Sequence, residues 1–481
     1  MVRISVIGCG HLGATHAACM AAIGHEVVGV EIDEEKTELL NSGRAWFHEP
    51  GLDAMLAANI AAGRLRFTTS FAEAASFARA HFIGVGTPGQ PDGSYDLSQL
   101  HGVLSALVPR LRGDALIIGK STVPPGTAAA LQAMANDLLT PGQGGSVEIA
   151  WNPEFLRESC ALADTLRPDR IVAGTTSARA AELIREIYQP ITHTGVPLLV
   201  TDLATAELVK GAANAFLAAK ISFSNAMADI CAATGGDVRA LAVALGLDPR
   251  IGPAFLRAGT GYGGACLPKD VRGLGAFASG IGIRRAADLL AAIDAVNEAR
   301  VGQAIDLIRH VLGPLAGRRI GVWGAAFKSG TDDVRDSPAL RVADGLRLFG
   351  AEVTVYDPMA TDTARTAAPE LKYADSALGA AAGADALVVA TAWPEFALAS
   401  PAEAAEIANR PVVIDICQGI DAGTWRSAGW EVASLLAARP AAGQRRPVAR
   451  RHTAGSAPAD RGLPTGQAAA DEAAADRVEG G

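Results

Sequence analysis

Short runs of β-branched and other apolar residues alternate with longer Ala- and Leu-rich stretches from the start of the chain. The short runs predict strands, and the longer stretches have the spacing of helices. This alternation is typical of βαβ units, which build a mostly parallel sheet with helices on both faces. The predicted strands are Ile4–Ile7, Val27–Ile32, His81–Val85, Ala115–Gly119, Val147–Trp151 and Ile171–Ala173.

The middle of the chain has a different, mainly helical pattern. We predict a long helix from Asp202, which suits an N-cap, to about Thr234, where Gly235 ends it. A second helical stretch runs from about Arg284 to Val311. Between the two lies a Gly-dense segment, Ala258–Asp270, which we expect to be a loop.

After Gly317 the alternation returns, with an echo of the beginning. "GHEVVGVE" (24–31) and "GAEVTVYD" (350–357) both place an acidic residue at the end of a second strand. The predicted class is therefore α/β, with two Rossmann-like doubly wound domains joined by a central long-helix region. The later strands are Arg319–Trp323, Glu352–Tyr356, Ala386–Ala390 and Val412–Ile416. The expected domains are 1–200 (nucleotide binding), 201–312 (central), 313–438 (second Rossmann-like) and a disordered tail at 439–481.

Composition agrees with this division and excludes several classes of protein. The 481 residues suffice for two or three domains, while the Ala/Gly/Pro/Arg-rich tail cannot bury a core. The net charge of −9 lacks the basic footprint of a nucleic-acid binder, so we expect no nucleic-acid partner. The six cysteines include no CxxC pair, which argues against a disulfide framework or a metal site.

The first 25 residues have a weak likeness to a signal peptide, because Ile4–His25 contains no acidic residue, Lys or Arg. Three histidines and four glycines interrupt that stretch, however, and no other segment offers the roughly 20 apolar residues of a membrane span. We therefore expect a soluble cytoplasmic protein without a membrane partner.

"GCGHLG" places Gly8, Gly10 and Gly13 in GxGxxG spacing directly after the first strand. Such glycines allow a tight turn and a close approach of the backbone to a pyrophosphate at a helix N-terminus. Glu31 follows the second strand, where a carboxylate can bind the adenosine ribose and repel a 2′-phosphate. The motif predicts a dinucleotide site that prefers NAD to NADP.

"WNPEFLRES" follows the strand Val147–Trp151. We interpret Asn152 as an N-cap with Pro153 at the first helical position, which would put Glu154 and Glu158 on one helix face at the sheet's carboxyl edge. These carboxylates either face a ligand or merely complement the helix dipole.

Two further segments offer reactive groups. Lys210 and Asn214 are polar positions four residues apart in the long helix, and they either face a ligand or are ordinary solvated side chains. Cys266 follows two glycines and precedes Lys269 and Asp270, and a nearby ammonium favours a thiolate. A lone thiol is more often buried and inert. Here the glycines and charges favour an exposed thiol in a site.

Together these segments resemble the nucleotide-sugar 6-dehydrogenases from Arg3 to about Trp430. The resemblance rests on "HEPGL" (48–52), "GTP…DGSYDLS" (86–98), "KSTVPPGT" (120–127), "NPEFLRES" (152–159), "PDRIVAG", "AELVKGAANAFLAAKISFSN", "DPRIG", "GYGGACLPKD" and "AAFKSGTDDVRDSP" (325–338). It implies that the sugar C6 alcohol is oxidised to a carboxylate with two NAD and one water, by way of a thiohemiacetal and a thioester on Cys266. UDP-glucose is the implied substrate of a homodimer, and the second Rossmann-like domain, 313–438, would bind its UDP group.

The resemblance also implies roles for individual residues. Lys210, Asn214 and Asp270 would handle the alcohol proton, the oxyanion and an ordered water, and Glu154 would act as a base. The NAD site would include Gly8, Gly10, Leu12, Gly13, Glu31, Lys36, Thr87, Thr122, Glu158, Lys269 and Arg335. The nucleotide sugar would contact Glu154, Phe155, Leu156, Arg157, Glu158, Lys210, Asn214, Phe255, Leu256, Arg257, Ala258, Gly259, Gly263 and Lys328, with Arg250 supplied by the partner subunit.

Some positions depart from the family pattern. Glu31 replaces the usual Asp, Ala265 a common Ser and Gly211 a common Tyr, and Cys417-Gln418 replaces the usual Arg-Asn. The alternatives are therefore a dehydrogenase of GDP-mannose or of an N-acetylated UDP-hexosamine. A catalytically inactive nucleotide-binding regulator is the alternative of another class, although it would not need a thiol beside Lys210 and Asp270.

Overall fold

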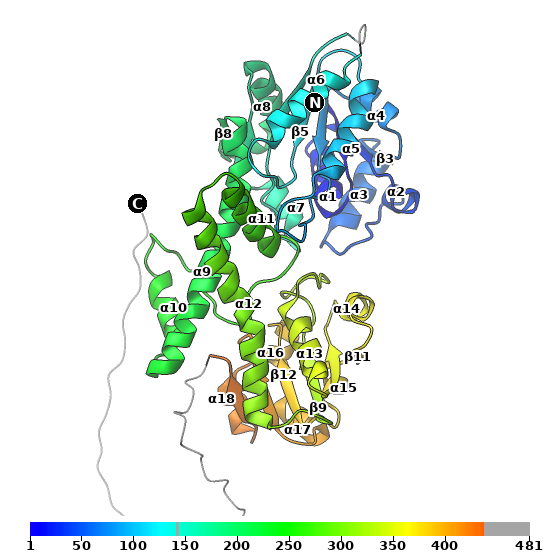
Figure 1. Ribbon diagram of the computed structural model, residues 1–481. Helices are drawn as coiled ribbons and strands as arrows, with labels where there is room; N and C mark the ends of the chain where they lie inside the picture. Colours follow the sequence, from blue (N-terminus) through cyan, green and yellow to red (C-terminus); the bar gives the residue numbers. More distant parts are fainter. Residues whose placement is uncertain (141–143, 437–481) are drawn as a thin grey trace, which may run out of the picture. The chain divides into compact units, whose positions relative to one another are not determined.

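Two sheets organise the chain, as the computed structural model in Figure 1 shows for residues 1–140 and 144–436. The first sheet has eight strands in the order β3-β2-β1-β4-β5-β6-β7-β8, and only the β6/β7 pair is antiparallel. The strands are β1 (Arg3–Ile7), β2 (Glu26–Val30), β3 (Leu65–Thr68), β4 (Ala80–Ile83), β5 (Ala115–Gly119), β6 (Val147–Trp151), β7 (Ile171–Gly174) and β8 (Leu198–Thr201).

Helices cover both faces of this sheet, as the alternating pattern predicts. Strands buried on both faces read as nearly continuous apolar runs, which is why β1, β4 and β5 were visible in the sequence. One face packs against α1 (His11–Ala22), α3 (Leu52–Ala61), α7 (Ala161–Leu166) and α8 (Ala178–Thr192). The other packs against α4 (Phe71–Phe77), α5 (Ser98–Leu107) and α6 (Thr127–Leu138), while α2 (Glu34–Asn41) lies beside β3.

The second sheet is fully parallel, in the order β11-β10-β9-β12-β13-β14. It repeats the order of the first six strands of the first sheet, which is the 3-2-1-4-5-6 arrangement of a dinucleotide fold. The predicted fold class is thus confirmed. The strands are β9 (Arg319–Trp323), β10 (Glu352–Tyr356), β11 (Lys372–Tyr373), β12 (Ala386–Val389), β13 (Val412–Asp415) and β14 (Glu431–Ser434). Its helices are α13 (Pro338–Leu348), α14 (Thr361–Ala367), α15 (Ala377–Ala381), α16 (Pro394–Leu398), α17 (Pro401–Ile407) and α18 (Ala422–Ser427).

Long helices join the two sheets. Asp202 caps α9 (Leu203–Thr234) by accepting from the Thr205 N–H, and Gly235 ends it with a φ of +78°. The helix is therefore confirmed, as is α12 (Arg284–Leu312) within a residue. A small apolar core, including Ala218 and Ile293, packs α9 and α12 against α11 (Leu267–Gly280). The short α10 (Val238–Gly246) packs on α9.

The acidic residues that follow the second strand of each sheet have different surroundings. Asp357, at the end of β10, is buried, and its carboxylate accepts hydrogen bonds from the backbone N–H groups of Ala325 (2.8 Å) and Ala326 (3.0 Å) and from Trp393 Nε1 (2.9 Å). Its other oxygen accepts from two further backbone N–H groups. This carboxylate is committed to the fold and has no capacity left for a ligand.

Two sequence expectations concern other regions. The predicted disordered tail, 439–481, lies outside the described residues. Within the described ranges, no helix combines the length and apolarity needed to cross a bilayer.

Candidate functional site

The turn between β1 and α1 has room for a pyrophosphate. A Cβ on Gly13 would lie 1.8 Å from the carbonyl oxygen of Gly8, so α1 can start this close to the turn only with glycine. A Cβ on Gly10, the N-cap of α1, would meet no atom within 4 Å, and no side chain caps the helix there. Open space in front of uncapped N–H groups suits an anionic group. The residues present therefore fit a dinucleotide.

Glu31 lies beside this turn, and its neighbour Asp33 has another task. The Glu31 carboxylate accepts from the N–H groups of Cys9 (3.2 Å) and Asp33 (3.2 Å). Asp33 is the N-cap of α2, accepts from the Lys36 N–H (3.1 Å) and pairs with the Lys36 ammonium (3.3 Å). Of the two carboxylates, Glu31 is thus the one that points back to the glycine turn.

The other residues predicted for the cofactor site follow the same sheet edge. Thr87 is buried and donates to the carbonyl oxygen of Thr122 (2.7 Å), which joins the loops after β4 and β5. Leu12 is half-buried on α1, and the Lys36 ammonium lies 4.6 Å from the ring centroid of Trp46. These side chains therefore lie on the loops and helix starts that follow β1, β2, β4 and β5.

The segment after β6 is not a helix, which corrects the prediction for Asn152. Residues 152–157 are extended or irregular, and α7 begins only at Ala161. The Asn152 side chain instead donates to the carbonyl oxygen of Val172 (2.7 Å) and accepts from Lys120 Nζ (2.9 Å) and from the Tyr188 hydroxyl (2.5 Å). Because these tertiary bonds use the side chain, it is not available as a helix cap.

A buried charge cluster lies where α9, α11 and this segment meet. Lys210 Nζ pairs with Glu154 Oε1 at 2.8 Å. Asn214 Nδ2 donates to Asp270 Oδ2 (2.6 Å), and Lys269 Nζ pairs with Asp270 Oδ1 (2.6 Å). Lys210, Asn214 and Asp270 are all buried, so they are not ordinary solvated side chains. The predicted long helix and the end of the predicted Gly-dense segment are thus brought together by Asn214 and Asp270.

Cys266 is solvent-exposed and is the N-cap of α11. The predicted loop therefore ends here, four residues earlier than expected, and Lys269 and Asp270 belong to a helix. Desolvation by the surrounding protein and the negative charge of Glu154 raise the pKa of the Cys266 thiol to about 11, although Lys210 opposes this. The nearby ammonium groups do lower this pKa, as expected, but desolvation and the carboxylates outweigh them, so the protonated thiol is favoured.

Glu154 and Lys210 stabilise each other's charged forms. Burial opposes ionisation of Glu154, but the Lys210 ammonium and its hydrogen bond bring the pKa of Glu154 below its usual range. Burial likewise opposes the charge on Lys210, but the carboxylate of Glu154 raises the pKa of Lys210. Lys120 is different, because desolvation lowers its pKa to about 8.

A second cluster joins the segment after β6 to the loop after β9. Lys328 Nζ donates to the carbonyl oxygen of Glu158 (2.8 Å), and Thr331 donates to its carboxylate (3.1 Å). Arg335 pairs with Asp333 (2.6 Å) and with Glu158 (3.4 Å). Burial and the charge of Asp333 raise the pKa of Glu158 to about 7. Three predicted residues, Glu158, Lys328 and Arg335, are thus brought together.

The predicted sugar segment 255–259 contacts the loop after β13. Gln418 Nε2 donates to the carbonyl oxygen of Ala258 (2.9 Å), and Arg257 donates to the carbonyl oxygen of Gln418. Phe255 and Gln418 both have positive φ, +65° and +61°, which is rare for such residues and found mostly at functional sites. Leu256 is buried, and Gly259 donates to Asn225 Oδ1 (2.8 Å).

Two predicted residues, Arg157 and Gly263, have surroundings other than expected. The Arg250 side chain, which was predicted to act at the partner subunit's site, is 87% exposed and pairs with Asp248. Arg157 pairs at the surface with Asp164 (2.7 Å). A Cβ on Gly263 would lie 2.3 Å from the carbonyl oxygen of Asp336, so this glycine permits close contact with the chain's own backbone. The sequence predicts, instead, that this glycine-rich backbone approaches a substrate closely.

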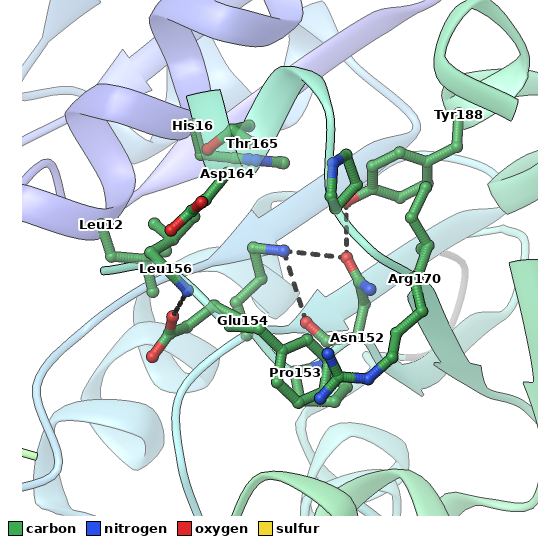
Figure 2. Close-up of a pocket in the computed structure, with 14 residues that line it drawn as sticks. Leu12, His16, Asn152, Pro153, Glu154, Leu156, Asp164, Thr165, Arg170 and Tyr188 are labelled. Carbon is green, nitrogen blue, oxygen red and sulfur yellow. Dashed lines mark hydrogen bonds between the residues drawn. The ribbon is translucent and has the colours of Figure 1, made fainter. Parts of the chain in front are cut away.

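Glu154 is one of the residues that line a cavity of about 50 Å³, and Figure 2 shows these residues. Phe155 and Leu156 line it, and the Arg170 guanidinium lies 3.8 Å from the ring centroid of Phe155. Sequence reasoning missed Lys120 here, and it missed Tyr95, whose hydroxyl lies 3.5 Å from Asp270 Oδ1. Lys120 belongs to "KSTVPPGT" and Tyr95 to "DGSYDLS", and their place in these motifs was the available signal.

Family models match nearly the whole described chain. Residues 2–192 match the NAD binding domain of the UDP-glucose/GDP-mannose dehydrogenase family, residues 204–299 its central domain, and residues 321–422 its UDP binding domain.

Individual relatives agree with these models. The UDP-glucose 6-dehydrogenase AglM of Haloferax volcanii is 42% identical over 82% of this chain and 92% of its own. That of Rhizobium meliloti is 39% identical over 86% and 95%. Among solved structures, a UDP-glucose dehydrogenase from Pyrobaculum islandicum has a TM-score of 0.83 at 36% identity, covering 91% of this chain and 98% of its own.

Proposed function

Since the chain belongs to the UDP-glucose/GDP-mannose dehydrogenase family, we propose that it is an NAD-dependent UDP-glucose 6-dehydrogenase. The reaction would convert UDP-glucose, two NAD and one water to UDP-glucuronate, two NADH and protons. Relatives that share about two fifths of their residues over most of the chain are named for this substrate, which supports UDP-glucose over the other sugars.

The observation that carries the proposal is the thiol of Cys266 at the edge of a buried cluster of two ammonium groups, two carboxylates and an amide. Four-electron oxidation of an alcohol passes through an aldehyde that must be retained between two oxidations. A thiol can retain it covalently, and the ammonium and amide donors can stabilise the oxyanion. A protein that only bound nucleotides would have no use for this combination.

The residues would act in sequence. NAD, when bound at the glycine turn, supplies the hydride acceptor for each oxidation. Lys210, Asn214 and Asp270 would take up the alcohol proton as the first hydride leaves C6. The Cys266 sulfur would then add to the aldehyde carbon while the thiol proton moves to the C6 oxygen, which gives a thiohemiacetal. Loss of a second hydride together with that hydroxyl proton would give a thioester. Glu154 takes a proton from the water that hydrolyses it, which frees the carboxylate and the thiol, while Asp270 orders the water.

Cofactor and sugar would approach from different parts of the chain. The cofactor would contact Gly8, Gly10, Leu12, Gly13, Glu31, Lys36, Thr87, Thr122, Glu158, Lys269 and Arg335. The sugar nucleotide would contact Glu154–Glu158, Lys210, Asn214, the segment 255–259, Gly263 and Lys328.

The free thiols of the described cysteines support a cytoplasmic location, where thiols stay reduced.

The working unit would be a homodimer formed along α9. Phe216, Phe223 and Ile230 follow one another at seven-residue spacing, so they share a helix face, and they are 68%, 50% and 54% exposed. Water contact with three large apolar side chains on one face is unfavourable, and a second copy of the same face would cover them. Arg250, which is exposed, would then reach the partner's substrate site.

Incubation with a panel of UDP-glucose, GDP-mannose and N-acetylated UDP-hexosamines tests the substrate. We expect UDP-glucose to give the highest kcat/KM and two NADH per UDP-glucuronate at exhaustion. The Cys266→Ser variant should bind NAD and lose steady-state turnover, because a serine ester forms and hydrolyses poorly. A ratio near one NADH, or turnover by this variant, would contradict the four-electron assignment, and preference for another sugar would contradict UDP-glucose.

A further inference from the structure

Lys120, in the loop after β5, is a lysine that the proposed chemistry does not use, yet it is buried. Its side chain is 6% exposed. Lysine is rarely buried without a partner, because removing an ammonium from water is costly. The acceptors of its hydrogen bonds both belong to Asn152, namely Oδ1 at 2.9 Å and the carbonyl oxygen at 3.4 Å. Lys120 and Asn152 both line the cavity, and the dashed lines at Asn152 in Figure 2 mark hydrogen bonds of this network.

Asn152 holds the start of the segment that carries Glu154. β6 and β7 share only the pair Trp151–Gly174, so the sheet gives this segment little support. The Asn152 N–H donates to the carbonyl oxygen of Gly119 (2.7 Å), and its side-chain amide donates to that of Val172 (2.7 Å). Lys120 and Tyr188 complete the network. Asn152 thus links β5, β7 and α8 two residues before Glu154.

A neutral side chain would suffice if the role of Lys120 were only to fill space. Replacing a whole buried ion pair by apolar groups of similar volume often leaves a protein equally or more stable. The positive charge does act on Glu154, because the ammonium groups of Lys210 and, to a smaller extent, Lys120 lower the pKa of that carboxyl against the effect of burial. The carboxylate acts in return on Lys120.

The other ionisable groups near this pair do not replace that charge. Burial and Lys120 lower the pKa of His16, which favours the neutral imidazole. Asp164 is paired with Arg157, and the Arg170 guanidinium lies over Phe155. The groups that face Lys120 and Glu154 are His16 on α1, Asp164 on α7, Arg170 before β7, Tyr188 on α8, Lys210 on α9 and Cys266 at the start of α11.

We propose that Lys120 is a positioning residue whose buried ammonium, held by Asn152, keeps the Glu154 carboxylate charged and in place beside Lys210. The inference rests on the proposed function, in which Glu154 acts as the base. Lys120 thus belongs to the site as a residue that contacts neither the sugar nor the cofactor and acts through Glu154.

The test compares Lys120→Met with the wild type in full-length protein. Loss of the ammonium raises the pKa of Glu154, so the acid limb of the kcat/KM–pH profile should move upward by about half a pH unit or more. Burial lowers the pKa of Lys120 to about 8, so keeping this ammonium inside opposes folding below that pH. Relief of this cost and loss of the two hydrogen bonds to Asn152 oppose each other, so the Tm of Lys120→Met at pH 7 should stay close to that of the wild type.

Three controls make the result specific. Lys372→Met removes an exposed lysine on β11 and should leave the profile unchanged. Glu154→Gln should remove the acid limb, and adding Lys120→Met to it should cause no further shift. Lys120→Arg, which keeps the charge, should move the limb back towards wild type, and Lys120→Gln replaces the Met variant if the latter does not fold.

The position of the acid limb decides the outcome. A lower Tm with an unmoved limb in the neutral variant would show a purely structural role and overturn the inference. If the wild type forms no NADH with any sugar nucleotide, the proposed function fails instead, and the two failures are distinct.

Discussion

Glu31 and Asp33 lie two residues apart after β2, but only one is expected to select the cofactor. The Glu31 carboxylate accepts a hydrogen bond from the Cys9 N–H in the glycine turn, whereas the Asp33 carboxylate caps α2. A carboxylate that binds the ribose repels a 2′-phosphate, so we predict that kcat/KM for NAD exceeds that for NADP by at least about tenfold, or 1.4 kcal/mol. Glu31→Ala should reduce this ratio, mainly by weakening NAD.

Asp33→Ala is the matched control for this prediction. Loss of a helix cap should lower the free energy of unfolding by about 1 kcal/mol and leave the cofactor ratio unchanged. Steady-state kinetics of both variants with both cofactors, together with denaturant unfolding, separate the two roles. If Asp33→Ala alone reduced the ratio, the placement of the ribose beside Glu31 would be wrong.

The reactivity of Cys266 should depend steeply on pH. With a pKa of about 11, the thiol is almost entirely protonated at pH 7, and the fraction of thiolate rises about tenfold per pH unit. We predict that alkylation of Cys266 by iodoacetamide accelerates about tenfold per unit from pH 7 to pH 9. Peptide-resolved mass spectrometry distinguishes it from the other exposed thiol, Cys160.

Glu154→Gln provides the internal test of the cause. Since the charge of Glu154 raises the pKa of Cys266, the variant should be alkylated faster than the wild type at every pH between 7 and 9. A plateau in the wild-type rate below pH 8 would contradict the raised pKa. For catalysis, the raised pKa implies that the proton must leave the thiol as the sulfur attacks the aldehyde.

At the scale of elements, α9 has two faces with different expected tasks. Lys210 and Asn214 are buried, and Asn214 donates to Asp270 on α11, while Phe216, Phe223 and Ile230 are exposed. We predict that Phe223→Asp converts a dimer into a monomer, because a buried aromatic at an interface centre contributes about 2 kcal/mol or more. Light scattering after size-exclusion chromatography measures the mass. Activity should fall in parallel, since Arg250 would lose the partner's site.

Leu398→Asp is the control for this substitution. Leu398 ends α16, a helix of the second sheet, and is 85% exposed, so a variant at this equally apolar but different position should remain dimeric. If Phe223→Asp also remained dimeric, the stripe on α9 would not be the interface.

The elements differ in how far the sequence could predict them. The predicted strands Val147–Trp151 and Arg319–Trp323 agree to the residue with the structure, because four of the five residues of each are buried and apolar or glycine. The helix expected at Asn152 is absent because the side chain that looks like a cap bonds across the sheet to Val172 and Lys120. A local pattern contains no information about such tertiary partners.

The candidate site shows the same limit. GxGxxG could be predicted because the tight turn requires glycine, and Glu31 because a carboxylate at this distance after the motif can bind the ribose. The burial of Lys120 could not, since lysine is usually exposed and only the packing of α1 and α8 encloses it. The sign of the pKa shift at Cys266 also depended on distances between α9, α11 and the segment after β6, which the sequence does not contain.

At the scale of the whole molecule, the two sheets share a strand order but differ at the acidic residue that ends the second strand of each. The carboxylate of Asp357 is saturated by the chain's own donors, whereas the matching Glu31 faces the open glycine turn. Of the two sheets in the described chain, the first is therefore the one that can bind a dinucleotide. The proposed reaction needs two such molecules for each sugar. The protein must then be processive towards its sugar and distributive towards its cofactor, exchanging one while a covalent bond to Cys266 retains the other.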